Sequence, residues 1–216
     1  LAGRRDVFWR KKSNGEAEVK MFFASDLHGS NVCFKKFVNS AQFYGANVLV
    51  MGGDLTGKAV IPIAEQGDGT YLTFMHGEQH RLKTKEELDD FIKRNGNMGF
   101  YPAVMSEAEY QTMKSDPDAQ AALFKRLVLE RVKEWADFAA QKLKGTDIPL
   151  VAIPGNDDFH EIDDILTKAP HFHFHVVPRQ PGSDWGIEPP QLATFDGAGR
   201  MQSTVHDPSD DAGRRT

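Results

Sequence analysis

Short apolar runs rich in β-branched and aromatic residues alternate along this chain with longer segments of helical periodicity. Three of these runs cover residues 22–24, 48–51 and 150–153, and the second and third end in or near glycine. Such runs are typical of strands that are buried on both faces of a parallel sheet. We therefore predict an α/β (α+β) fold with these three strands at its centre.

Helical periodicity follows the first strand and precedes the third. Ser30 is a suitable N-cap for a helix that runs to about residue 44. The predicted inner face of this helix is made by Val32, Phe34, Phe37, Val38 and Ala41. Further along, Pro117 stands at the start of a long amphipathic run that extends to about residue 144.

The segment 59–116, between the second and third strands, has a pattern of its own. Residues 59–63 and 70–74 flank a Gly-Asp-Gly turn and predict a β-hairpin. Thr84 and Ser106 each stand three residues before a Glu, which is the spacing of a helix capping box. This insert is expected to cover a neighbouring site, to offer a surface to a partner, or only to pack against the rest of the domain.

Polar side chains that can bind metal follow each of the three strands. Asp26 and His28 are two residues apart, so they point to the same side of the chain if it stays extended. Asp54 follows the second strand, and Asn156 and Asp157 follow the third. Sites in open α/β sheets lie outside the carboxyl ends of the strands, which predicts a metal site here. The alternative is that each residue only caps the next turn or helix.

Three short motifs occur together at these strand ends. They are Asp-x-His at residues 26–28, Gly-Asp-x-x-Gly at residues 53–57 and Gly-Asn-Asp at residues 155–157. In this order they resemble the first three motifs of the calcineurin-like metallophosphoesterases, and the resemblance extends over about residues 19–177. It implies a β-sandwich flanked by helices, with a two-metal centre at the strand ends.

The resemblance also implies a role for individual residues. Asp26 and His28 would bind the first metal ion, Asp54 would bridge both ions, and Asn156 would bind the second. Asp157 stands where the family most often has a His near the leaving group, so we take it as the candidate catalytic residue; a carboxyl there needs a raised pKa to donate a proton. The expected reaction is hydrolysis of a small phosphate mono- or diester by a hydroxide that bridges two divalent ions. Mixed nitrogen and oxygen ligands favour manganese, with iron, zinc, cobalt or nickel as alternatives.

The chain departs from the family pattern downstream of the third motif. The family adds a lone His and then a Gly-His-x-His motif, and this sequence has no Gly-His-x-His. Instead His171, His173 and His175 alternate with phenylalanine. This alternation predicts an edge strand with a solvated histidine face, and the alternative is a second metal-binding patch.

The domain organisation follows from the same patterns. Residues 1–18 are expected to form an N-terminal extension, and residues 19–178 the metallophosphoesterase domain. Residues 179–216 are rich in Pro, Gly, Asp, Ser and Arg, which predicts a poorly ordered tail. The chain begins with Leu1, and we expect a fragment whose sandwich is incomplete at the C-terminus.

Composition limits the partners and the compartment. Apolar residues make up 40% of the 216 residues, and the net charge of −5 gives no basic footprint for nucleic acid. No apolar run approaches the length of a membrane span. The single cysteine, Cys33, excludes an internal disulfide and fits a reducing, cytoplasmic location. The sequence does not specify an oligomeric state.

Two other classes of function fit parts of the chain. Residues 52–58 have the Gly-x-x-x-x-Gly-Lys spacing of a nucleotide-binding P-loop. However, Ala59 stands where a P-loop has Ser or Thr for magnesium, and the next residues predict a strand where a P-loop begins a helix. The second class is a catalytically incomplete metal-binding fragment or binding module of the same fold.

Overall fold

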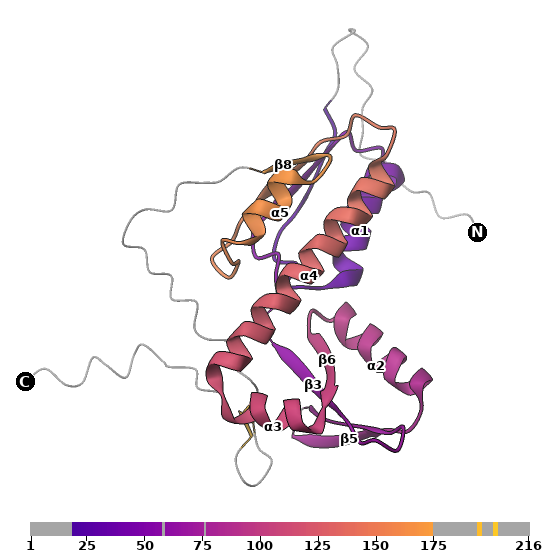
Figure 1. The fold of residues 1–216 in the computed structure, drawn as a ribbon. Coiled ribbons are helices and arrows are strands. Elements are labelled where there is room, and N and C mark those ends of the chain that lie inside the picture. Colours follow the sequence, from indigo (N-terminus) through magenta and orange to yellow (C-terminus); the bar gives the residue numbers. More distant parts are fainter. Residues whose placement is uncertain (1–18, 58, 76, 175–193, 196–200, 203–216) are drawn as a thin grey trace, which may run out of the picture.

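The computed structural model describes residues 19–57, 59–75, 77–174, 194–195 and 201–202. Within these ranges the chain is a mixed α/β protein with two four-stranded sheets and five helices (Figure 1). The first sheet contains β1 (Met21–Ala24), β2 (Val48–Gly52), β7 (Leu150–Ile153) and β8 (Phe172–Phe174). The second contains β3 (Val60–Glu65), β4 (Tyr71–Met75), β5 (Glu78–Leu82) and β6 (Tyr101–Ser106). The helices are α1 (Asn31–Tyr44), α2 (Lys85–Asn97), α3 (Glu107–Ser115), α4 (Pro117–Leu143) and α5 (Ile162–Lys168).

The first sheet is parallel throughout and has the strand order β1-β2-β7-β8. The three strands predicted from the apolar runs therefore lie side by side. Ala24 pairs with Met51, and Met51 pairs with Ala152, so the carboxyl ends of these strands are level. This register brings the loops that carry the predicted ligands to one edge of the sheet.

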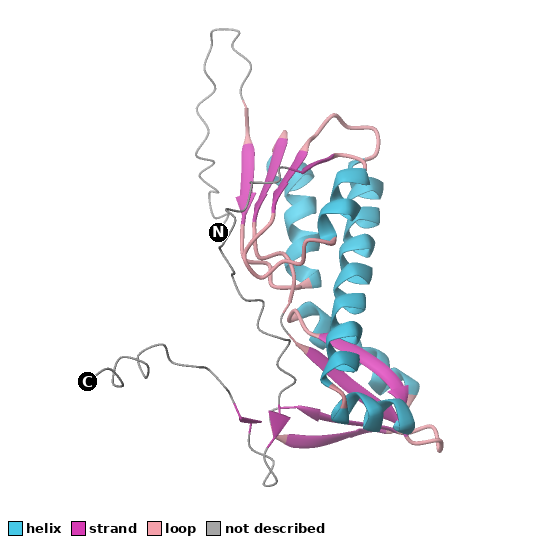
Figure 2. Ribbon diagram, turned by 60° about the vertical axis from the view of Figure 1, so that its left-hand side comes forward, coloured by secondary structure: helices cyan, strands magenta, loops and turns pink. Residues whose placement is uncertain are grey.

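Helices cover one face of the first sheet. Leu49, Met51 and Leu150 are fully buried beneath α1, α4 and α5. On the opposite face Met21 is 57% exposed and Phe23 is 60% exposed, and none of the described helices lies there (Figure 2). The prediction that these strands are buried on both faces is therefore wrong for β1 in the part of the chain that is described.

Helix α1 begins and ends where its sequence predicts. The Ser30 hydroxyl accepts a hydrogen bond from the Cys33 amide, and Gly45 ends the helix in the left-handed conformation. The predicted inner positions from Phe34 to Ala41 are buried, whereas Val32 is 37% exposed. Val32 stands two residues before Phe34, about 200° around the helix from it, so the two cannot share a narrow buried face.

Helix α4 packs against α1 and α5, which lie beside the first sheet, and against α3 and β6 next to the second sheet (Figure 1). Its Trp135 ring stacks on Phe34 of α1 at a centroid distance of 4.3 Å, and the indole Nε1 donates to Asn31 Oδ1 at 2.7 Å. Its Phe124 meets the ring of Tyr101, on β6, edge to face at 5.6 Å. None of the described helices, α4 included, combines the length and apolarity needed to cross a membrane.

The insert, residues 59–116, forms the second sheet with the order β5-β4-β3-β6. Its β3–β4 hairpin and the capping box of Ser106 are confirmed. Thr84 caps α2, but the Glu87 carboxylate accepts from the Lys83 amide and leaves the box of Thr84 incomplete. One face of this second sheet packs on α2 through a small apolar cluster. Val60, Tyr101 and Ala103 of the sheet belong instead to the main hydrophobic core, together with residues of α4.

Among the described strands, the histidine-rich strand β8 lies at the edge of the first sheet, as predicted. His173 is exposed on it, whereas His171 precedes the strand with a left-handed φ of 68°, which breaks the expected alternation. His175 lies outside the described residues, as does the predicted extension 1–18. Of the predicted tail, 179–216, only β9 (Thr194–Phe195) and β10 (Met201–Gln202) are described, and they pair in antiparallel fashion.

Candidate metal centre

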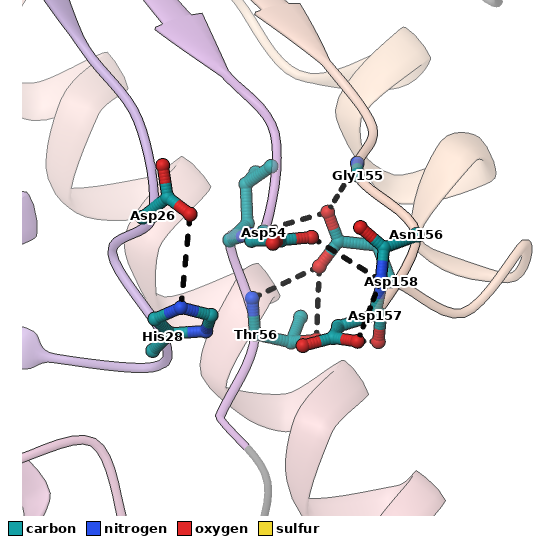
Figure 3. Close-up of polar contacts among 9 residues, drawn as sticks. Asp26, His28, Asp54, Thr56, Gly155, Asn156, Asp157 and Asp158 are labelled. Carbon is teal, nitrogen blue, oxygen red and sulfur yellow. Dashed lines mark hydrogen bonds and ion pairs between the residues drawn. The ribbon is translucent and has the colours of Figure 1, made fainter. Parts of the chain in front are cut away.

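Three of the four predicted metal ligands converge at the carboxyl edge of the first sheet. Asp26, His28 and Asp54 each offer a ligand atom, and these atoms all lie within 4.8 Å of one another. The Asp26 carboxylate approaches His28 Nε2 at 3.8 Å (Figure 3). Their side chains are 62% and 41% exposed, respectively, so an ion or a substrate can reach them from solvent.

Backbone hydrogen bonds hold the two ligand loops together beyond the strands. The amides of Asp26, His28 and Gly29 donate to the carbonyl oxygens of Gly53, Asp54 and Leu55 at 3.1, 2.9 and 2.8 Å. The pairing of β1 and β2 thus continues into the loops that follow them. The position of Asp54 relative to the Asp-x-His motif is therefore set by the backbone.

The three candidate ligands share an unusual backbone conformation. Asp26, His28 and Asp54 have φ angles of 57°, 43° and 46°, in the left-handed region. Among the other non-glycine residues that are described, only His171 has a positive φ. Each such residue costs about 1 kcal/mol, and strain of this kind concentrates at functional sites. Asp26 and His28 thus converge as predicted, but through a left-handed turn and not through an extended chain.

The third loop places Asn156 and Asp157 beside Asp54. The Asp157 amide donates to Asp54 Oδ1 at 3.3 Å, and Asn156 Nδ2 donates to Asp157 Oδ1 at 3.0 Å. Asp54 consequently lies between the Asp26–His28 pair and the Asn156–Asp157 pair (Figure 3). A side chain at Gly155 would overlap the Asp54 backbone and carboxylate, so this close approach requires glycine.

Asp158 is a structural residue of the site to which sequence reasoning assigned no role. Its fully buried carboxylate accepts from the amides of Leu55, Thr56 and Gly155 at 2.8–3.1 Å, and from the Thr56 hydroxyl at 2.9 Å. It thereby fixes the loop after Asp54 to the loop after β7. The only signal in the sequence is its place directly after Asn156-Asp157, because its partners at Leu55 and Thr56 stand 103 and 102 positions earlier.

The donor set suits a transition-metal ion. His28 Nδ1 is buried and has no hydrogen-bond partner among the described residues, so Nε2 is the nitrogen that the ring offers to an ion. Nε2 lies 3.8 Å from Asp26 Oδ1, and Asp54 adds a second carboxylate to the same cluster. Mixed imidazole and carboxylate ligands suit Mn, Fe, Co or Zn better than Ca or Mg. The residues present therefore fit a metal ion held by Asp26, His28 and Asp54.

Tyr101 supports the loop that follows Asp54. Its hydroxyl accepts a hydrogen bond from the Gly57 amide at 2.8 Å, and the side chain is buried. Burial disfavours the charged phenolate and raises the pKa of Tyr101 from 10.0 to about 12. The residue lies on β6, so the insert contacts the loop that carries the candidate ligand Asp54.

Tyr101 should make the protein sensitive to alkaline pH. Between the unfolded pKa of 10.0 and the folded value of about 12, the unfolded chain loses this proton and the folded chain keeps it. The free energy of unfolding therefore falls as pH rises through this window, by about 3 kcal/mol in all. We expect Tyr101→Phe, which leaves the Gly57 amide without its acceptor, to be about 1–3 kcal/mol less stable than wild type in urea at about pH 9. The difference should narrow at about pH 11, and an unchanged difference would contradict the assignment.

Comparisons of this chain with protein-family models, with curated proteins and with solved structures gave no match. The fold and the site define a mixed α/β protein with an Asp-His-Asp cluster at the carboxyl ends of a parallel sheet.

Proposed function

We propose that this protein is a metal-dependent phosphoesterase of the calcineurin-like class. The observation that carries the proposal is the convergence of Asp26, His28 and Asp54 within 4.8 Å at adjacent strand ends. Left-handed backbone strain at all three residues adds support, because such strain is retained where the geometry of a site requires it. A small phosphate mono- or diester is the proposed substrate.

The proposed roles follow the positions of the side chains. Asp26 and His28 would hold one divalent ion, Asp54 would contribute its carboxylate to both ions of a two-metal centre, and Asn156 would offer its carbonyl oxygen to the second. When bound, such ions neutralise the charge of a phosphate ester and activate water for attack, with manganese favoured. The Asp157 carboxylate accepts from Asn156 Nδ2, which orients that amide and keeps Asp157 near the reacting centre.

The face of the first sheet opposite the helices supports the β-sandwich expected for a calcineurin-like phosphoesterase. All-parallel sheets are normally covered on both faces. Here Met21 and Phe23 are exposed on the side opposite the helices, and the Phe23 ring lies across Gly52 of the neighbouring strand. A second sheet packed on this apolar face would complete a β-sandwich.

A catalytically incomplete metal-binding module is the second candidate function. The three-residue cluster is smaller than a full dinuclear ligand set, and the sequence carries no Gly-His-x-His motif that would extend it. This candidate predicts metal binding without turnover. A P-loop is disfavoured, since β3 begins at Val60, where a P-loop would begin a helix.

Hydrolysis should depend on a transition-metal ion. The protein is first treated with a chelator, and hydrolysis of mono- and bis-p-nitrophenyl phosphate is then measured with Mn²⁺, with Ca²⁺ as a control ion, and with no ion. We expect at least about tenfold more activity with Mn²⁺ than with Ca²⁺, because the mixed ligands suit manganese. Mn²⁺ binding measured by calorimetry, with no hydrolysis of either substrate, would support the binding module. A hydrolysis rate that changes neither with the chelator nor with the added ion would refute the metal-dependent phosphoesterase.

A further inference from the structure

Three glycine backbones meet directly behind His28. Gly29 follows the Asp-x-His motif, Gly57 follows Asp54, and Gly99 belongs to the insert between α2 and β6. A side chain at Gly57 would overlap the Gly99 carbonyl oxygen, and one at Gly99 would overlap the His28 carbonyl oxygen. A Cβ on Gly29 would lie 2.7 Å from the Gly99 oxygen. We call this contact of Gly29, Gly57 and Gly99 the glycine junction.

Arg131, on α4, forms hydrogen bonds to the backbone at and next to the glycine junction. Its Nη1 donates to the Gly29 carbonyl at 2.8 Å, and its Nη2 donates to the Phe100 carbonyl at 3.3 Å. The guanidinium also lies 4.9 Å from the centre of the Tyr101 ring. Burial lowers the pKa of Arg131, and the carbonyl acceptors and the aromatic ring compensate part of its desolvation. One planar group therefore joins the His28 loop to the insert.

Two further bonds tie the same segments together. The Ser30 hydroxyl donates to the Asn97 carbonyl at 2.5 Å, next to the glycine junction. The Tyr101 hydroxyl accepts from the Gly57 amide at 2.8 Å. Both metal-binding loops are thus attached to residues 97–101, through hydrogen bonds whose partners stand 67 and 44 positions apart in the sequence.

We propose that Arg131 is a positioning residue for the metal centre and that residues 97–101 of the insert form its rigid support. This inference rests on the proposed function. The left-handed backbone at His28 and Asp54 is strained, and it persists only where surrounding contacts over-determine it. Arg131 and the glycine junction supply those contacts on the side away from solvent. The insert is then a part of the metal centre's scaffold, in addition to any role on its outer surface.

Cobalt binding tests the proposal, because Co²⁺ reports its ligands through its visible absorption. We expect Arg131→Met to weaken Co²⁺ binding about 10–100-fold, the range seen for residues that orient ligands, and to change the absorption spectrum. Arg131→Lys keeps the charge but not the two-pronged donor, so it should restore the affinity only in part. Arg126→Met is the matched control on the same helix, since Arg126 is exposed and, among the described residues, forms an ion pair with Glu130. This variant should bind Co²⁺ like wild type.

Hydrogen exchange separates this proposal from the proposed function. In Arg131→Met the amides of residues 26–29 and 54–57 should exchange faster, while those of β2 and β7 keep their protection. If wild type binds no Co²⁺, the proposed metal site is refuted. Faster exchange confined to the two loops would still show that Arg131 and residues 97–101 hold these loops in place. If Arg131→Met unfolds, Arg131→Lys is used to test the Arg131 contacts, and Tyr101→Phe, which removes only the Gly57 contact, should speed exchange in residues 54–57 alone. Wild-type exchange in both loops together with wild-type Co²⁺ behaviour in the folded variants overturns the proposal.

Discussion

Replacing Asp54 with alanine is expected to reduce manganese-dependent hydrolysis at least about a hundredfold, because loss of a ligand should exceed the loss seen for residues that only orient one. Asp54 is the member of the cluster that touches both sides of the site. Its ligand atom lies within 4.8 Å of those of Asp26 and His28, and its Oδ1 accepts from the Asp157 amide. Alanine removes both carboxylate oxygens and with them the connection between the two halves.

The asparagine variant separates chemistry from backbone strain at this position. Asp54 has a φ of 46°, which asparagine tolerates and alanine does not, so only Asp54→Ala should also lose about 1 kcal/mol of stability. Asp54→Asn keeps one carbonyl oxygen but no charge, and we expect it to lose most of the activity at wild-type stability. Rates, Mn²⁺ affinity and thermal unfolding are compared with Asp137→Ala, an exposed position on α4. Wild-type activity in Asp54→Asn and Asp54→Ala would refute the metal role.

Replacing Asp158 with alanine should destabilise the whole fold by about 3–5 kcal/mol, because several buried donors lose their acceptor at a cost of about 1–3 kcal/mol each. The change leaves the amides of Leu55, Thr56 and Gly155 without their acceptor in a buried site. The same amides belong to the loops that carry Asp54 and Asn156, so metal binding should fail along with stability.

Urea unfolding measures the stability effect at Asp158. Asp158→Asn retains one carbonyl oxygen and should lose less stability than alanine, since part of the hydrogen bonding survives. Asp137→Ala again serves as the exposed control and should change the free energy of unfolding by less than about 0.5 kcal/mol. A small effect of Asp158→Ala would mean that the loops after β2 and β7 are held by other contacts.

Local patterns were reliable guides to the elements of this fold. Ser30 and Gly45 bound α1, and Ser106 caps α3, because caps depend on residues within one turn of the helix. The Gly-Asp-Gly turn between β3 and β4 was equally readable, as its glycines supply positive φ angles. These features need no distant partner, so a single sequence reveals them.

The Asp-His-Asp cluster was expected from its residue types, but its geometry was not. Asp26 and His28 were expected to converge along an extended strand, yet β1 ends at Ala24 and both residues are left-handed. Their approach to Asp54 depends on hydrogen bonds between the loops after β1 and β2. The burial of β1 was misjudged for a related reason, since the apolar content of a strand does not state which faces are covered.

By itself the sequence determined the three central strands, the β3–β4 hairpin, the long helices α1 and α4, the chemical types of the candidate ligands and their order along the chain, whereas β5 and β6 were not predicted. Periodicity, capping and strand-end chemistry act over a few residues, and that short range is why they can be read directly. Only the tertiary structure decided three contacts. The Asp158 carboxylate accepts from the loop after Asp54, Arg131 donates to the Gly29 carbonyl, and Gly99 packs against the His28 carbonyl. These contacts join segments far apart in the chain, and they arise when the sheets and α4 bury a common core, so no local pattern encodes them.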